Sequence, residues 1–150
     1  MGYVASNLVA DEKVVKMGTV HWGVFVPGAI WVVLGFLVIR GQGDVAFFGA
    51  LMFMLGALLL VRAFIYKIST ELAVTDKRVI AKFGFIRRQT TELLHSKVEG
   101  LTVNQGILGR VLNFGTVVVN GTGSGRTPIR GISAPLDFRK SALAEIESKT

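Results

Sequence analysis

The sequence contains no cysteine, which excludes a disulfide framework and any site built from thiolate ligands. It has only two histidines, His21 and His95, and neither an HExxH nor a GxSxG motif, so the usual signatures of zinc proteases and serine hydrolases are missing. Charge is scarce as well, since 18% of the 150 residues are charged against 51% that are hydrophobic. We therefore expect no enzyme, no cofactor and no metal site.

Two long stretches without charge dominate the first half of the chain. The first runs from Trp22 to Ile39, and at about 1.5 Å per residue a helix of this length spans roughly 27 Å, close to the thickness of a bilayer's hydrocarbon core. The second begins at Val45, after a connection of five residues that starts at Arg40. We therefore predict a transmembrane hairpin over residues 22–66, with helices at about 22–39 and 45–66. Two buried helices of a soluble core are the alternative.

Glycines recur at a helical spacing inside both stretches. Gly28 and Gly35 are seven residues apart, and so are Gly49 and Gly56. Seven residues make about two helical turns, so each pair lies on one face and lets a second helix approach closely. We predict that these four glycines pack the hairpin, with contact between two copies of the chain as the alternative. Pro27 is expected to mark the start of regular helix.

Basic residues flank the hairpin on both sides. Lys and Arg in short flanking segments favour the cytoplasmic face, so we expect a multi-pass protein of the cell (inner) membrane with both termini cytoplasmic. Four residues near the ends of the helices are expected at the membrane interface, because aromatic rings and long cationic side chains reach the headgroups from there. They are Trp22, Arg62, Tyr66 and Lys67.

Beyond the hairpin, the hydrophobic period changes from helical to alternating. Short strands are predicted at residues 68–74, 78–83, 88–94, 98–105, 116–119 and 127–132, where Pro128 favours a sheet edge. Residues 106–115 are predicted as a short helical turn packed on the core. A final helix starts near Pro135, and one apolar face of it is expected to close the sheet. That face contains Leu136, Phe138, Ala142, Leu143 and Ile146.

The segment before the hairpin has an alternating pattern between Glu12 and Val20, which predicts one more strand. That strand needs a partner, and the only sheet available is in the tail. We accordingly divide the chain into a cytoplasmic leader (residues 1–21), the hairpin (22–66) and a cytoplasmic domain (67–150). If the leader strand pairs with the tail, the hairpin is an insertion within one domain.

Several runs of the sequence resemble one known family. These runs are ELAVTDKRVI at residues 71–80, GFIRR at 84–88, SKVEGL at 96–101, LGRVLNFGTV at 108–117 and GTG at 121–123. Together they resemble the bacterial PH-domain membrane proteins, also called the membrane-flanked or DUF304 family. The resemblance implies an α+β membrane protein, in which a two-helix transmembrane hairpin accompanies a small antiparallel PH-like β-sandwich or barrel capped by a C-terminal helix. The family has no common catalytic motif, so the resemblance carries over no catalytic residue.

Two functions remain open. The first is a non-enzymatic, membrane-anchored binding or scaffold module that acts through a membrane protein partner or through self-association. The second is a sensor of anionic lipid headgroups, because a basic residue near an anionic leaflet contributes about 1 kcal/mol to binding. The residues for this lipid site are Lys77, Arg78, Lys82, Arg87 and Arg88. Membrane lipids are expected as neighbours in either case, and nucleic acid is not expected as a partner.

One glycine-rich run invites a further interpretation. Residues 121–126 are rich in glycine and end at Arg126, a composition that is able to cradle phosphate. The run lacks the Lys-Ser/Thr ending of a P-loop, and a strand is predicted after it where a P-loop has a helix. We therefore predict a hairpin loop there.

Overall fold

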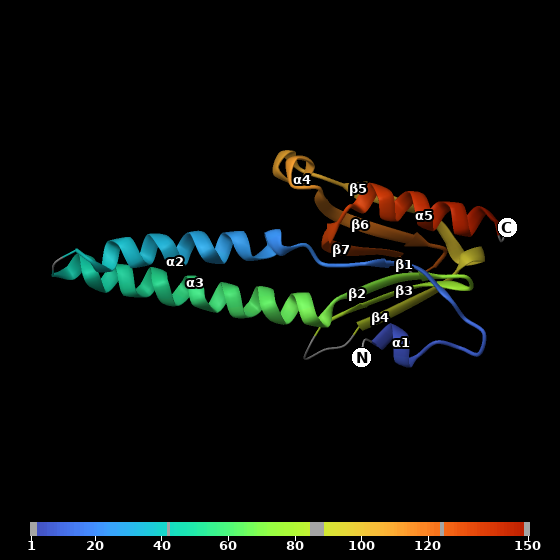
Figure 1. Cartoon of the computed structure of the whole chain (residues 1–150), viewed down its shortest axis with the longest axis horizontal. Helices are drawn as coiled ribbons and strands as arrows, with labels where there is room; N and C mark the ends of the chain where they lie inside the picture. The colour runs from blue at the N-terminus through green and yellow to red at the C-terminus, as the bar shows by residue number, and fades with distance from the viewer. Residues whose placement is uncertain (1–2, 42, 85–88, 124, 149–150) are drawn as a thin grey trace. The chain divides into compact units, whose positions relative to one another are not determined.

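The computed structural model describes residues 3–41, 43–84, 89–123 and 125–148. The chain forms two compact units. The first combines Met1–His21 with Ser69–Thr150, and the second is Trp22–Ile68. Figure 1 shows the elements of both units along the chain.

The second unit is a helical hairpin. A 3-10 turn, η1 (Trp22–Phe25), leads into α2 (Val26–Ile39), and α3 (Asp44–Ser69) returns. Pro27 lies at the first turn of α2, which confirms its prediction as the start of regular helix. The helix α3 continues past the predicted end at Tyr66, so the strand predicted from residue 68 was wrong at its start. No Gly or Pro interrupts the sequence there, and the alternation of residues 68–70 is too short to outweigh a continuing helix.

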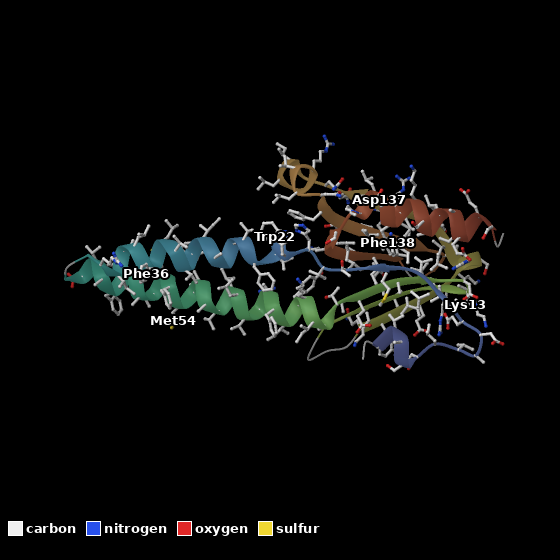
Figure 2. The ribbon with its side chains drawn as sticks, viewed as in Figure 1. Lys13, Trp22, Phe36, Met54, Asp137 and Phe138 are labelled. Carbon is white, nitrogen blue, oxygen red and sulfur yellow. The ribbon has the colours of Figure 1, made fainter. Side chains whose placement is uncertain are left out.

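Both helices are long and apolar enough to cross a membrane, judged by length and composition. Only 17% and 11% of the residues in the two spans are buried, whereas the core helices of a soluble protein are mostly buried. Large apolar side chains point outward along them, including Phe36, Phe48 and Leu58. Figure 2 shows these outward side chains along the hairpin, with Phe36 and Met54 labelled.

The helices of the hairpin approach each other at glycine. A Cβ added at Gly35 would meet the backbone nitrogen of Phe53, and one added at Gly56 would lie 2.5 Å from the backbone nitrogen of Val32. Larger residues at these positions would push the helix backbones apart. Atoms of the opposite helix also meet a Cβ at the other predicted packing residues, Gly28 and Gly49.

The first unit contains two antiparallel sheets. The four-stranded sheet has the order β1-β2-β3-β4, formed by β1 (Val14–Gly18), β2 (Glu71–Thr75), β3 (Arg78–Phe83) and β4 (Gln89–Leu94). Strand β1 comes from the leader and pairs with β2, where Met17 lies opposite Ala73 and Gly18 opposite Leu72. One sheet therefore contains strands from both sides of the hairpin.

The three-stranded sheet has the order β5-β6-β7, with β5 (Val98–Asn104), β6 (Phe114–Gly121) and β7 (Gly125–Ser133). A 3-10 turn, η2 (His95–Lys97), connects β4 to it, and a bridge between Val20 and Ile132 joins the two sheets again. Strand β7 is an edge strand, as Pro128 predicted. Residues 121–123 end β6 and enter a turn, and Gly125 already belongs to β7, so the glycine-rich run forms a hairpin connection.

The last helix, α5 (Pro135–Ser148), covers the β5–β7 sheet (Figure 1). Phe138 points from α5 to the sheet and is 1% exposed, while Asp137 points away (Figure 2). Phe138, Ala142 and Ile146 are buried as predicted, but Leu136 is exposed. The prediction for Leu136 was wrong because the first turn of α5 turns Pro135 and Phe138 to the sheet, and Leu136 lies outside the face that these two buried residues define.

A short helix at the N-terminus, α1 (Tyr3–Ser6), covers the outer face of the four-stranded sheet. Val4 is fully buried and packs with Ala73 and Ile80, and Tyr3 and Leu8 lie against this cluster. This cover explains why β2 is buried on both faces.

Candidate functional site

The first unit has two distinct ends along its strands. At one end the chain passes from β1 through His21 into the hairpin and returns from the hairpin to β2, which begins at Glu71. We call this the exit end. At the opposite, far end, Thr75 lies across from Val14 and begins the turn into β3.

The β5–β7 sheet also contributes to the exit end. The backbone N–H of His21 donates to Gly131 O at 2.7 Å, and the His21 ring stacks on Phe114 with 5.2 Å between the ring centroids. Phe114 begins β6, and the connection from β5 to β6 leads directly into it. That connection contains α4 (Ile107–Val111).

Helix α4 presents an apolar face to solvent. Ile107 is 85% exposed, Leu108 73% and Val111 78%. The prediction that residues 106–115 pack on the core was therefore wrong. The physical reason is Gly109, which is buried and whose missing side chain leaves room for the carbonyl oxygen of Phe114 at 2.5 Å from an added Cβ. The helix turns its glycine face to the sheet and its larger side chains outward.

A side-chain bridge fixes the connection that contains α4. The Gln105 amide nitrogen donates to Gly109 O at 3.3 Å and to Phe114 O at 3.1 Å. The backbone N–H of Ala134 donates to Asn113 O at 2.9 Å, which ties the end of the connection to the start of α5. The outward face of α4 is thus held by contacts on both sides.

A groove of about 950 Å³ adjoins α4. Its lining combines amide and hydroxyl side chains with one guanidinium and two apolar residues. The residues are Val103, Asn104, Gln105, Gly106, Arg110, Asn113, Thr116 and Leu136. No acid or base pair of the kind that general acid–base catalysis requires lies in this lining, and its one formal charge is that of Arg110.

The predicted headgroup residues do not form one cluster. Lys77 and Arg78 lie at the far end of the four-stranded sheet, and Lys82 lies near its exit end, opposite Glu71. Consecutive turns of an antiparallel meander fall at opposite ends of the sheet, which separates them. Arg87 and Arg88 lie outside the described residues.

Arg78 makes contacts within the fold. Its guanidinium donates to Glu12 Oε1 at 3.0 Å and Oε2 at 2.9 Å, to Glu92 Oε2 at 2.6 Å and to the carbonyl oxygen of Asn7 at 2.9 Å. The Glu12 side chain is fully buried, and Thr75 Oγ1 donates to it at 2.7 Å. These contacts bind the N-terminal segment to the turn between β2 and β3.

Electrostatics favour this arrangement of Glu12 and Arg78. Burial by itself raises the pKa of Glu12, but hydrogen bonds from Arg78, the Val9 N–H and Thr75 outweigh it and hold that pKa at about 2. The hydrogen bond to Glu12 raises the pKa of Arg78 further above its ordinary value. Arg78 and Glu12 are therefore charged together at neutral pH.

The two lysines of the predicted headgroup site also contact the N-terminal segment. Lys77 Nζ donates to the carbonyl oxygen of Ala10 at 2.8 Å. Lys82 Nζ lies 3.7 Å from Glu71 Oε1 and 4.9 Å from the ring centroid of Tyr3. Glu71 in turn accepts the backbone N–H groups of Tyr3 and Val4, the second at 3.0 Å. Burial raises the pKa of Glu71, but these two N–H groups and Lys82 lower it overall.

Sequence reasoning missed this role of the N-terminal segment. The available signal was the spacing of Val4 and Leu8, which are one helical turn apart. Glu12 is the only buried acidic residue among those described, but its burial has no mark in the sequence. A segment of so few residues carries too little periodicity to predict packing by itself.

The predicted interface residues occupy the ends of the hairpin. Trp22, Arg62 and Lys67 are exposed, and Tyr66 is partly buried. Lys67 Nζ lies 5.7 Å from the ring centroid of Phe25, so the start of the first helix and the end of the second are at the same level. Among the described residues, no group of three His, Asp or Glu side chains is placed to hold a metal ion.

Comparison with known proteins gives one match. A family model described as bacterial PH domain matches residues 18–146, which confirms the resemblance seen in the sequence. The two antiparallel sheets and the C-terminal helix fit such a domain. Neither the curated proteins nor the solved structures contain a significant match.

Proposed function

The chain belongs to the bacterial PH domain family, and we propose that it is a non-enzymatic, membrane-anchored module that binds a protein partner at the cytoplasmic face of the membrane. Domains of the PH type are generally binding modules without catalytic activity. Two apolar helices with exposed side chains support the membrane anchor.

The topology in this proposal is a hairpin that crosses the membrane twice, with both termini cytoplasmic. Lys13 and Lys16 precede the first helix and Lys67 lies in the last turn of the second, and such flanking cations favour the cytoplasmic side. The pairing of β1 with β2 supports the same conclusion, because both ends of the hairpin enter adjacent strands of one sheet, about 5 Å apart. Anchoring at two neighbouring points restricts the height and tilt of the domain above the membrane.

The observation that carries the partner proposal is the uncovered edge of β4. The strand is at one edge of its sheet, and Gln89, Thr90 and Glu92 are exposed along it. Between β4 and the edge strand β7 lies a groove of about 620 Å³, lined in part by Thr90 and Arg126. An exposed strand edge offers backbone donors and acceptors to an extended segment of another protein.

Internal contacts favour a protein partner over the alternative of a lipid-headgroup sensor. Arg78 is paired with Glu12 and Glu92, and Lys77 and Lys82 contact the N-terminal segment. A headgroup that bound these cations would have to replace contacts that stabilise the fold. These three basic residues are therefore poorly disposed to provide the main binding energy.

Site-specific photocrosslinking tests the proposal. The full-length protein, in its native membrane, would carry a photoreactive amino acid at Thr90, or at Lys140 on α5 as an exposed control. We expect a protein adduct from Thr90 and none from Lys140. An adduct of twice the chain's mass identifies self-association, and any other discrete mass identifies a second protein.

Two outcomes contradict this proposal. If Thr90 gives no more protein adduct than Lys140, the β4 edge is not the binding surface. If Thr90 crosslinks only to lipid, the domain meets the membrane through this edge, and the alternative function is favoured.

A further inference from the structure

The exposed apolar face of α4 is unusual in the first unit. Ile107, Leu108 and Val111 are each at least 73% exposed and lie within one short helix. Exposed apolar side chains are ordinary when scattered, but a contiguous group of this exposure indicates a surface that contacts another apolar phase.

This face is preformed. Gly109 fits against the carbonyl oxygen of Phe114, so a rotation that buried the apolar side chains would have to bring larger groups into the space that only glycine fits. The Gln105 amide bridges Gly109 O and Phe114 O, which resists such a rotation. The apolar face consequently needs no rearrangement before it meets its partner.

Connectivity places α4 at the exit end of the first unit. The next residue after His21 is Trp22, which begins the hairpin unit, and the His21 ring stacks on Phe114. Phe114 follows Val111 by three positions along the chain, a separation that spans at most about 10 Å. Within the first unit, α4 therefore lies at the same end as His21, the last residue before the hairpin.

We propose that α4 inserts Ile107, Leu108 and Val111 into the interfacial region of the membrane that the hairpin crosses, as a third point of attachment. This inference rests on the proposed membrane anchoring. Interfacial elements bury apolar side chains about 5–10 Å into the boundary between headgroups and acyl chains, while cationic side chains stay among the headgroups. Arg110 is exposed within α4 and supplies that cation.

A membrane fits this face better than a protein partner or a second copy. The apolar group is small and has a basic residue but no acidic one within α4, which complements an anionic leaflet. The adjoining groove also has no acidic residue in its lining, so headgroup phosphates meet no repulsion there. Its location at the exit end makes the membrane surface available without any association step.

Single cysteines carrying an environment-sensitive fluorophore test this proposal, since the chain has no cysteine of its own. The full-length protein is reconstituted into vesicles of anionic and zwitterionic lipid, with the label at Leu108→Cys or Val111→Cys. Leu94→Cys is the matched control, because Leu94 is also an exposed leucine, 57% exposed, but at the far end. Phe48→Cys on α3 reports the hairpin itself.

We expect blue-shifted emission from Leu108→Cys and Val111→Cys, and a loss of more than half of the fluorescence when the lipids are brominated near the glycerol. Leu94→Cys should show neither change. If Phe48→Cys is quenched while both α4 labels behave like Leu94→Cys, the role of α4 is refuted and the anchoring stands. If Phe48→Cys is not quenched, the anchoring fails and the inference fails with it.

A protein contact at α4 has its own signature in the same experiment. Blue-shifted emission without quenching by the brominated lipid would mean that protein covers the face, and it would overturn the proposal. Two label positions guard against the loss of one variant, and both replaced side chains are exposed, so neither substitution removes a core contact.

Discussion

Replacing Arg78 by methionine tests how the N-terminal segment is held to the sheet. The substitution removes three kinds of contact at once: those to Glu12, to Glu92 and to the carbonyl oxygen of Asn7. It also leaves the fully buried carboxylate of Glu12 without its cation. Breaking one side of a buried ion pair costs about 3–5 kcal/mol, and we expect a loss of unfolding free energy in that range.

The dependence on pH gives a second and independent measure of the same contact. The pKa of Glu12 is about 2 in the folded protein against an ordinary 4.5. Each unit corresponds to about 1.4 kcal/mol, so the charged carboxylate stabilises the fold by about 3 kcal/mol at neutral pH. Because the folded pKa is the lower one, this stability is complete above about pH 4.5 and is lost as the pH falls toward 2.

Arg78→Met should reduce that loss at acid pH. In Arg78→Met, fewer hydrogen bonds oppose the effect of burial on the pKa of Glu12. The pKa of Glu12 in the folded protein therefore moves closer to its pKa in the unfolded protein. Hydrogen exchange of the full-length protein in detergent, from pH 7 down to the acid transition, follows the segment directly through the amides of Val4 and Val9. Both amides are bonded to glutamate side chains, those of Glu71 and Glu12.

The control for this experiment is Lys140→Met, which removes the same charge from an exposed position on α5. Arg78→Met should speed exchange at Val9 strongly, and Lys140→Met should leave it unchanged. If the two variants are equally stable at pH 7, the contacts of Arg78 contribute nothing. If Arg78→Met loses as much stability at acid pH as the original protein, the Glu12 carboxylate is not the source of that loss.

Two further substitutions test other contacts. Gly35→Val places a side chain against the backbone of Phe53, so it should destabilise the hairpin by about 1–3 kcal/mol and lower the unfolding temperature in detergent. Ala29→Val, at an exposed position on α2, is its control. Equal effects of the two substitutions on the unfolding temperature would contradict the packing role of Gly35. Val4→Ala should cost about 2 kcal/mol in denaturant unfolding because Val4 is fully buried, whereas Val9→Ala, at a 55% exposed site, should cost little. A Val4→Ala protein as stable as Val9→Ala would show that α1 is not part of the core.

The hairpin and the strands of the tail were predictable because their signals are local. A charge-free run of bilayer length, glycines at helical spacing and alternating short strands each appear within one window of sequence. Pro27 and Pro128 marked a helix start and a sheet edge for the same reason, since proline restricts the backbone wherever it occurs.

The properties of α4 were not predictable from its pattern. Ile107, Leu108, Val111 and Leu112 have the spacing of a helix packed on a core, and nothing in that spacing tells which side the core is on. The contact of Gly109 with Phe114 decides it, and this contact depends on how β6 leaves the connection. A helical pattern of two turns or fewer is therefore as compatible with an exposed surface as with a buried one.

The basic residues illustrate a different limit. Lys77, Arg78 and Lys82 are close in sequence, and that closeness suggested one cluster. The length of β3 puts Arg78 and Lys82 toward opposite ends of the sheet, and the acidic partners Glu12 and Glu71 come from distant parts of the chain. Charge pairing over such separations has no signature in the sequence.

The central claim is that a membrane hairpin is inserted into a single domain, whose two parts lie on the same side of the membrane. Impermeant maleimide labelling of intact bacterial cells tests it with single cysteines in the otherwise cysteine-free chain. Asp44→Cys, at the start of α3, should react in intact cells, whereas Lys13→Cys and Lys140→Cys should react only after permeabilisation. Labelling of Lys13→Cys and Lys140→Cys from opposite sides, or protection of all three in intact cells, would contradict the account.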